Sequence, residues 1–168
     1  TITGNILATS PDLEKIVNLK LADGQFITNT SGANNTVIGH QMAVDLFGTS
    51  QAIGQNIYIK GQPFLVVGVL EKHKNSINFS NVDFDNVAII NFSAGKILNQ
   101  DTIQIQQINV KVNSINNLAS TDENIRKVVA EAHKDNDDFE VLSGDKISHP
   151  ANQFIEIITM VLTLVASV

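Results

Sequence analysis

The run from Pro63 to Leu70 (PFLVVGVL) is the feature that most constrains the fold. From Phe64 onward it contains only apolar residues and one glycine. A strand with one face in water alternates apolar and polar residues, whereas a strand buried on both faces is apolar throughout. We therefore predict that residues 63–70 form a central, buried strand.

Patterns around this run predict strands that alternate with helices. Gly61-Gln62 is expected to form the turn of a hairpin that joins residues 55–60 (QNIYIK) to the central strand. Gly48 is expected to end a preceding helix in the left-handed conformation. Ala22-Asp23-Gly24 is predicted to be a turn, and residues 71–83 a loop. Further strands are predicted over residues 1–9, 36–39 and 86–92, and helices after a cap at Ser10, over 40–47, and after a cap at Ser93 as far as Leu98.

The segment 103–142 predicts a β-α-β unit. Residues 103–112 (IQIQQINVKV) alternate as in a strand with one wet face, and residues 138–142 (DFEVL) predict a second strand. The helix between them is expected from Ser120 to His133, where Ser120 and Glu123 match a capping box. Its buried stripe is predicted to consist of Ile125, Val128, Val129 and Ala132.

The last segment, residues 150–168, is more apolar than the rest of the chain. From Gln153 to Val168 the only charged residue is Glu156. The run is shorter than the roughly 20 residues that a transmembrane helix needs. Composition leaves two interpretations open: the first turns of a transmembrane helix, or a helix packed on the domain's own core.

Composition excludes several classes of function. The net charge is −6, with only 11 lysines and arginines, whereas a nucleic-acid partner needs a basic surface. The absence of cysteine excludes disulfides, thiolate zinc sites and a cysteine nucleophile. The four histidines lie far apart in the sequence, without the spacing of paired metal ligands. We therefore predict no catalytic, cofactor-binding or metal-ligating residue in this chain.

Five short motifs follow one another in a defined order between Val37 and Leu70. They are Val37-Ile38-Gly39, Leu46-Phe47-Gly48, Gly54-Gln55-Asn56-Ile57, Gly61-Gln62-Pro63-Phe64 and Val66-Val67-Gly68-Val69-Leu70. With residues 8–12 (ATSPD) and 19–25 (LKLADGQ) before them, they resemble the extracytoplasmic, periplasmic core domain of MacB-like ABC-transporter permeases, the FtsX/LolC group. Gln25 stands where that family usually has arginine.

The resemblance implies an α+β fold with two lobes. A porter-like β-α-β lobe would comprise residues 1–33 and 100–146, and a small α/β lobe, sabre-like in shape, would be inserted into it over residues 34–99. Residues 150–168 would then be the start of a transmembrane or membrane-proximal helix. This agrees with the β-α-β unit that the residue pattern itself predicts over 103–142.

The resemblance also implies a mechanical, non-catalytic function. The permease would pair with a second copy or a paralogue, and ATP and Mg would bind a cytoplasmic ATP-binding domain. The domain would transmit the motion of the transmembrane helices to substrate export or lipoprotein release. Its expected location is the extracytoplasmic face of the bacterial cytoplasmic (inner) membrane, periplasmic in a Gram-negative cell. The alternative from another class is an extracellular ligand-binding sensor domain of a membrane receptor.

The loop over residues 71–85 is the candidate partner-contact segment. It carries Lys72, Lys74, Phe79 and Phe84 among polar residues. Because loops often carry binding residues, we expect these four side chains to contact a periplasmic adaptor or a lipoprotein. A disordered loop tip is the other interpretation.

Overall fold

The computed structural model describes residues 4–30, 34–72, 82–100, 102, 104–133 and 139–143. The chain forms two compact units, residues 1–110 and residues 111–168. Each unit is described by itself.

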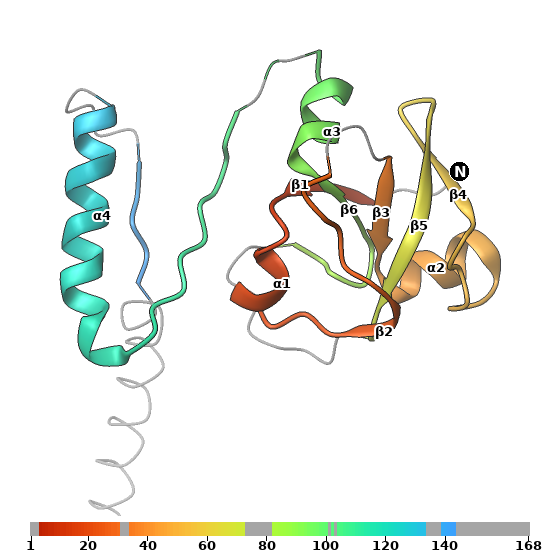
Figure 1. The fold of residues 1–168 in the computed structure, drawn as a ribbon, viewed down its shortest axis with the longest axis horizontal. Helices are drawn as coiled ribbons and strands as arrows, with labels where there is room; N and C mark the ends of the chain where they lie inside the picture. The colour runs from red at the N-terminus through yellow and green to blue at the C-terminus, as the bar shows by residue number, and fades with distance from the viewer. Residues whose placement is uncertain are drawn as a thin grey trace, which may run out of the picture. The chain divides into compact units, whose positions relative to one another are not determined.

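The first unit is built on one six-stranded mixed sheet (Figure 1). The strand order is β1-β6-β3-β5-β2, and β4 also pairs with β5. The strands are β1 (Asn5–Thr9), β2 (Leu21–Gly24), β3 (Asn35–Ile38), β4 (Asn56–Ile59), β5 (Gln62–Leu70) and β6 (Val87–Asn91). Pairing with β2, β3 and β4 confirms β5 as the predicted central strand.

A bulge in β5 changes which face of the sheet its side chains occupy. Thr36 of β3 pairs with Val66, but the next residue of β3 pairs with Gly68, so Val67 is an extra residue. One extra residue reverses the alternation of side chains between the two faces of a strand. Val66 and Val69 therefore belong to the same core, although they are an odd number of residues apart.

Each face of the sheet carries its own core. The first core contains Ile38, Phe64, Val66 and Ile90 of the sheet, covered by residues of α2 (His40–Phe47) and α3 (Phe92–Leu98). The second core, on the other face, includes Leu13 of α1 (Leu13–Ile16). Successive residues of β6 alternate between the two cores, as a strand buried on both faces requires.

Two turn predictions can be compared with the backbone. Gly48 follows α2 with a φ of 73°, which confirms the predicted left-handed helix end. The β4–β5 hairpin is also confirmed, but its two turn residues are Lys60 and Gly61, with φ of 49° and 81°, rather than Gly61 and Gln62. Positive φ at both positions is the geometry that suits the twist of a two-residue hairpin.

Three predictions from short polar motifs are wrong. Residues 22–24 are part of β2, because pairing with β5 outweighs the turn-forming residues Asp23 and Gly24. Helix α1 begins after Asp12 rather than Ser10. Helix α3 is capped by Asn91, whose side chain accepts a hydrogen bond from the Ala94 amide, rather than by Ser93.

The second unit contains a short 3-10 helix, η1 (Ile115–Asn117), followed by α4 (Leu118–Ala132). Helix α4 confirms the predicted helix but begins two residues earlier, and the Ser120 hydroxyl donates to the Asn117 carbonyl instead of forming a capping box. The described parts of 103–112 and 138–142 contain no strand. Alternation marks a segment that can pair, but a strand forms only where a neighbouring strand accepts its hydrogen bonds.

The bounds predicted for the two lobes stay a prediction, beside which the strand pairing and the compact units can be set. All six strands share one sheet, so β1 and β2 from residues 1–33 group with residues 34–99. The division between compact units falls after Val110. In the described part of the chain, no helix is both long and apolar enough to cross a membrane, and the predicted helix over 150–168 lies outside that part.

Candidate functional site

The described residues hold no grouping that suggests metal chemistry. Among them, no three His, Asp or Glu side chains come close enough to hold a metal ion. His40 and His133 lie in different units, and His73 and His149 fall outside the described part. The candidate features in this part of the molecule are therefore surfaces and contacts between elements.

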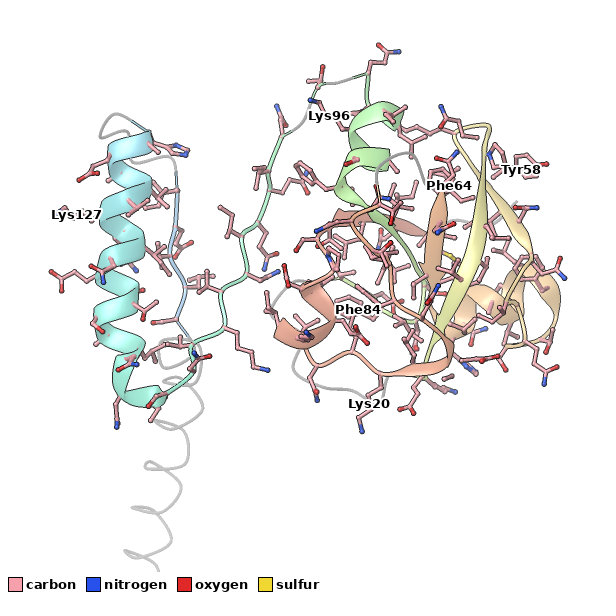
Figure 2. The ribbon with its side chains drawn as sticks, viewed as in Figure 1. Lys20, Tyr58, Phe64, Phe84, Lys96 and Lys127 are labelled. Carbon is pink, nitrogen blue, oxygen red and sulfur yellow. The ribbon has the colours of Figure 1, made fainter. Side chains whose placement is uncertain are left out.

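The four predicted partner-contact residues have different outcomes. Lys72 is exposed just after β5, and Lys74 and Phe79 lie outside the described residues. Phe84 is only 4% exposed and belongs to the second core with Leu13 and Val87 (Figure 2). The expectation for Phe84 is therefore corrected: an aromatic residue in a polar loop sequence can still be drawn into the nearest core.

An exposed apolar surface on the β4–β5 hairpin was not predicted. Tyr58, labelled in Figure 2, is 74% exposed, and Leu65 is 40% exposed. Tyr58 lies directly opposite Pro63 in the register, and Asn56 lies opposite Leu65. These side chains share one face of the β4–β5 pair, which we call the hairpin face. The alternation of residues in β4 could have predicted that Tyr58 is exposed. The exposure of Leu65 could not have been predicted in this way, because Leu65 lies in the apolar run that was expected to be buried on both faces.

Helix α4 has an apolar stripe that remains largely uncovered by the described residues. None of its residues is buried, and Val128 is 64% exposed. An isolated helix of this length is marginal in water, and burial of an apolar face usually supplies most of its stability. The predicted stripe is thus confirmed as a pattern but not as a buried face.

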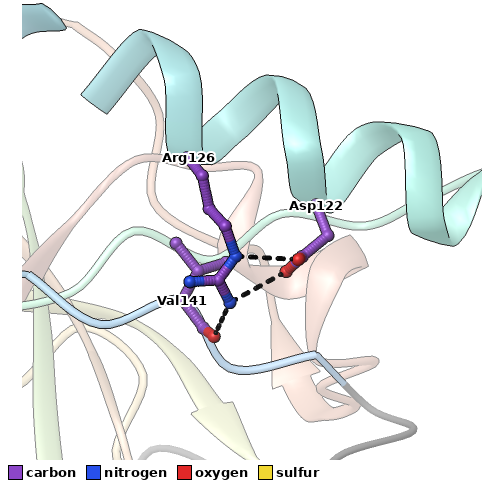
Figure 3. Close-up of polar contacts among 3 residues, drawn as sticks. All are labelled: Asp122, Arg126 and Val141. Atoms are coloured by element: carbon purple, nitrogen blue, oxygen red, sulfur yellow. Dashed lines mark hydrogen bonds and ion pairs between the residues drawn. The ribbon is translucent and has the colours of Figure 1, made fainter. Parts of the chain in front are cut away.

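Within the second unit, Arg126 joins α4 to residues 139–143. Its guanidinium donates hydrogen bonds to the Asp122 carboxylate and to the Val141 carbonyl oxygen (Figure 3). We call this group of three residues the Arg126 clamp. The hydrogen bond to Asp122 raises the pKa of Arg126 above its ordinary value, and nearby Glu140 acts in the same direction. The Arg126 guanidinium is therefore positively charged, and the Asp122 carboxylate beside it balances that charge.

Comparison with known protein families identifies one that covers most of the chain. The MacB-like periplasmic core domain matches residues 1–128. This stretch includes the whole sheet unit and the greater part of α4.

Relatives with curated descriptions are transporter permeases. The pyoverdine export ATP-binding/permease protein PvdT of Pseudomonas savastanoi pv. phaseolicola is 30% identical over 133 residues, which cover 77% of this chain and 20% of that protein. The macrolide export ATP-binding/permease protein MacB of Wolinella succinogenes is 24% identical over 164 residues, covering 96% of this chain and 25% of that protein. The chain therefore spans about a fifth to a quarter of the length of these relatives.

Two solved structures share the fold. The extracellular domain of the noncanonic ABC-type transporter YknZ from Gram-positive bacteria gives a TM-score of 0.64 at 21% identity, covering 80% of this chain and 67% of that one. The periplasmic region of MacB from Actinobacillus actinomycetemcomitans gives 0.61 at 18% identity, covering 85% and 63%.

The family match and the shared fold agree with the resemblance carried by residues 37–70. They favour a transporter part over the sensor domain of a receptor. The chain belongs to the family of MacB-like periplasmic core domains, which are extracytoplasmic parts of ABC transporter permeases.

Proposed function

We propose that this domain transmits ATP-driven motion of transmembrane helices to the export or release of a substrate on the outer side of the membrane. The observation that carries the proposal is the sheet unit, whose central strand β5 is packed by a core on each face. Closely packed interiors deform little and pass displacement from one side to the other. A unit of this construction suits a mechanical role better than a ligand-binding one.

The relatives' names support the energy source in this proposal. PvdT and MacB are described as ATP-binding/permease proteins for export, and this chain corresponds to a fraction of their length. We place ATP and Mg on a cytoplasmic ATP-binding domain, fused or separate, that serves a pair of permease subunits. The domain itself would be non-catalytic and would face the outside of the bacterial cytoplasmic membrane.

A linker insertion tests the transmission. A flexible Gly-Ser segment inserted after Ser148 in the complete transporter should leave ATP hydrolysis unchanged but weaken the mechanical connection to the domain. The measurement is hydrogen exchange in β5 and α4 with and without ATP plus vanadate, which needs no identified substrate. We expect wild-type exchange to respond to the nucleotide and the variant to lose that response.

The same insertion next to Thr49, in the exposed loop after α2, is the matched control. It adds equal flexibility away from the predicted path and should keep the response. A Ser148 insertion that responds to ATP as strongly as wild type would refute the proposal.

Contact between the 71–85 loop and a periplasmic adaptor or lipoprotein remains part of this proposal. The exposed position of Lys72 supports it, whereas Phe84 is committed to the core. A photo-crosslinking amino acid at position 79, compared with one at the exposed Tyr58, tests the contact in cells. Mass spectrometry should identify an adaptor or lipoprotein crosslinked from position 79 in excess over position 58. Equal or absent crosslinking at position 79 would rule the contact out.

A further inference from the structure

We propose that Arg126 is a positioning residue that latches residues 139–143 onto α4, so that displacement of the chain beyond Ser143 is passed to α4. The inference rests on the proposed transmission function and assigns part of it to one side chain. It concerns contacts within the second unit alone.

The geometry of the Arg126 clamp carries the proposal. Nε of Arg126 lies 2.9 Å from Oδ2 of Asp122, and Nη2 lies 3.4 Å from Oδ1. Asp122 is one helical turn earlier, so it holds the guanidinium against α4 in a defined orientation. Nη2 then donates to the Val141 carbonyl oxygen at 2.6 Å (Figure 3). The planar group thus connects the helix to the backbone of another segment.

The contact between Arg126 and Val141 matters because residues 139–143 have no regular secondary structure. None of these five residues belongs to a helix or strand, so no ladder of hydrogen bonds fixes their path. A second contact involves Phe139, the first residue of the segment. Its ring and that of His133 have centroids 5.8 Å apart. The clamp contacts the segment from the middle of α4, and the ring pair contacts it from His133, just past the end of the helix.

The choice of residue type agrees with positioning. Arg126 is the only arginine in the chain, and the remaining ten of its eleven lysines and arginines are lysines. A guanidinium can engage a carboxylate and a carbonyl through a rigid fork, whereas a lysine ammonium is a point charge on a flexible stem. The Arg126 side chain is 40% exposed and that of Asp122 is 19% exposed. Ion pairs with this exposure contribute little to stability, so a directional role explains the clamp better than a stabilising one.

The first test measures local order in the full chain. We expect 15N-relaxation order parameters of Glu140, Val141 and Leu142 near the rigid value of about 0.85 in the wild type, falling below about 0.6 in Arg126→Gln. Arg126→Lys should fall nearly as far, because the charge stays but the fork is lost. Lys127→Gln, which removes a neighbouring exposed charge, should leave the values unchanged (Figure 2). Unchanged amide shifts in β5 and β6 would show that each variant is folded.

The second test measures transmission in the complete transporter. Hydrogen exchange in α4 is compared with and without ATP plus vanadate. Arg126→Gln should reduce the nucleotide-dependent change several-fold, while Lys127→Gln keeps it and ATP hydrolysis stays at the wild-type rate.

Each contrary outcome has its own meaning. Order parameters in Arg126→Gln that match the wild type would overturn the latch, because another contact would then hold the segment. A disordered segment with a full nucleotide response in α4 would overturn it as well, because the contact would not carry motion. Failure of the proposed function is separate: in that case wild-type α4 itself shows no response to the nucleotide.

Discussion

Replacing Gly39 with alanine should be among the most damaging single substitutions in the sheet unit. Gly39 lies between β3 and α2 with an ordinary φ of −66°, so alanine meets no backbone penalty there. Space is the limitation. An added Cβ would fall inside van der Waals contact of backbone atoms of Phe84 and Asp85. These are backbone atoms, which cannot move aside as a flexible side chain can.

The magnitude follows from what must shift. The Gly39 amide donates to the Val87 carbonyl at 2.9 Å, and the Met42 amide donates to the Asp85 carbonyl at 3.0 Å. Moving residues 84–87 away breaks both hydrogen bonds, each with a net value of about 1 kcal/mol. Overpacking adds about 1–3 kcal/mol. Gly39→Ala should therefore lower the free energy of unfolding by about 3–5 kcal/mol.

Urea denaturation followed by far-UV circular dichroism measures this loss, and Gly61→Ala is the matched control. Gly61 has a φ of 81° in the hairpin turn, and an added Cβ there meets open space. Its loss should be about 1–2 kcal/mol, from the left-handed backbone alone. A Gly39 variant that unfolds within about 1 kcal/mol of wild type, or that is more stable than the Gly61 variant, would refute the reasoning.

Three further substitutions test burial and hydrogen bonding by the same denaturation assay. Phe84→Ala should lower the free energy of unfolding by about 3–5 kcal/mol, because the ring belongs to the second core. A loss below about 1 kcal/mol would show that Phe84 is not part of this core. Asn91→Ala removes the cap of α3 and should cost about 1 kcal/mol, whereas Ser93→Ala should cost less; the reverse order would contradict the assigned cap. Thr36→Val removes a buried hydroxyl that donates to the Ile89 carbonyl at 3.0 Å and should cost about 1–3 kcal/mol; no change would show that this bond is unimportant.

Several elements could be predicted because their signals are local. Helix α2 shows an apolar face over eight residues, and Gly48 marks its end. The β4–β5 hairpin follows from an alternating segment and an apolar run, separated by a short turn that contains glycine. In each case the information lies within a few residues of the element, so the rest of the chain need not be known.

The failures share a different cause. The alternation in 103–112 predicts a strand, yet pairing depends on a neighbour that the described residues do not supply. Asp23 and Gly24 favour a turn, but they pair with residues of β5 and are therefore part of β2. Phe84 was predicted to lie in a polar loop, but its side chain packs into the second core. The residues of a short segment do not show which distant strands or core residues will lie beside it in the folded chain.

The sequence alone determined the family, the central strand and most helices, because ordered motifs and apolar periods are properties of contiguous residues. The tertiary structure decided the bulge at Val67, the burial of Phe84 and the contact between Arg126 and Val141. Each of these depends on segments brought together by folding: β3 with β5, the 82–85 segment with α1, and α4 with residues 139–143. A pairing register or a shared hydrogen bond belongs to two segments at once, and neither segment's sequence specifies its partner.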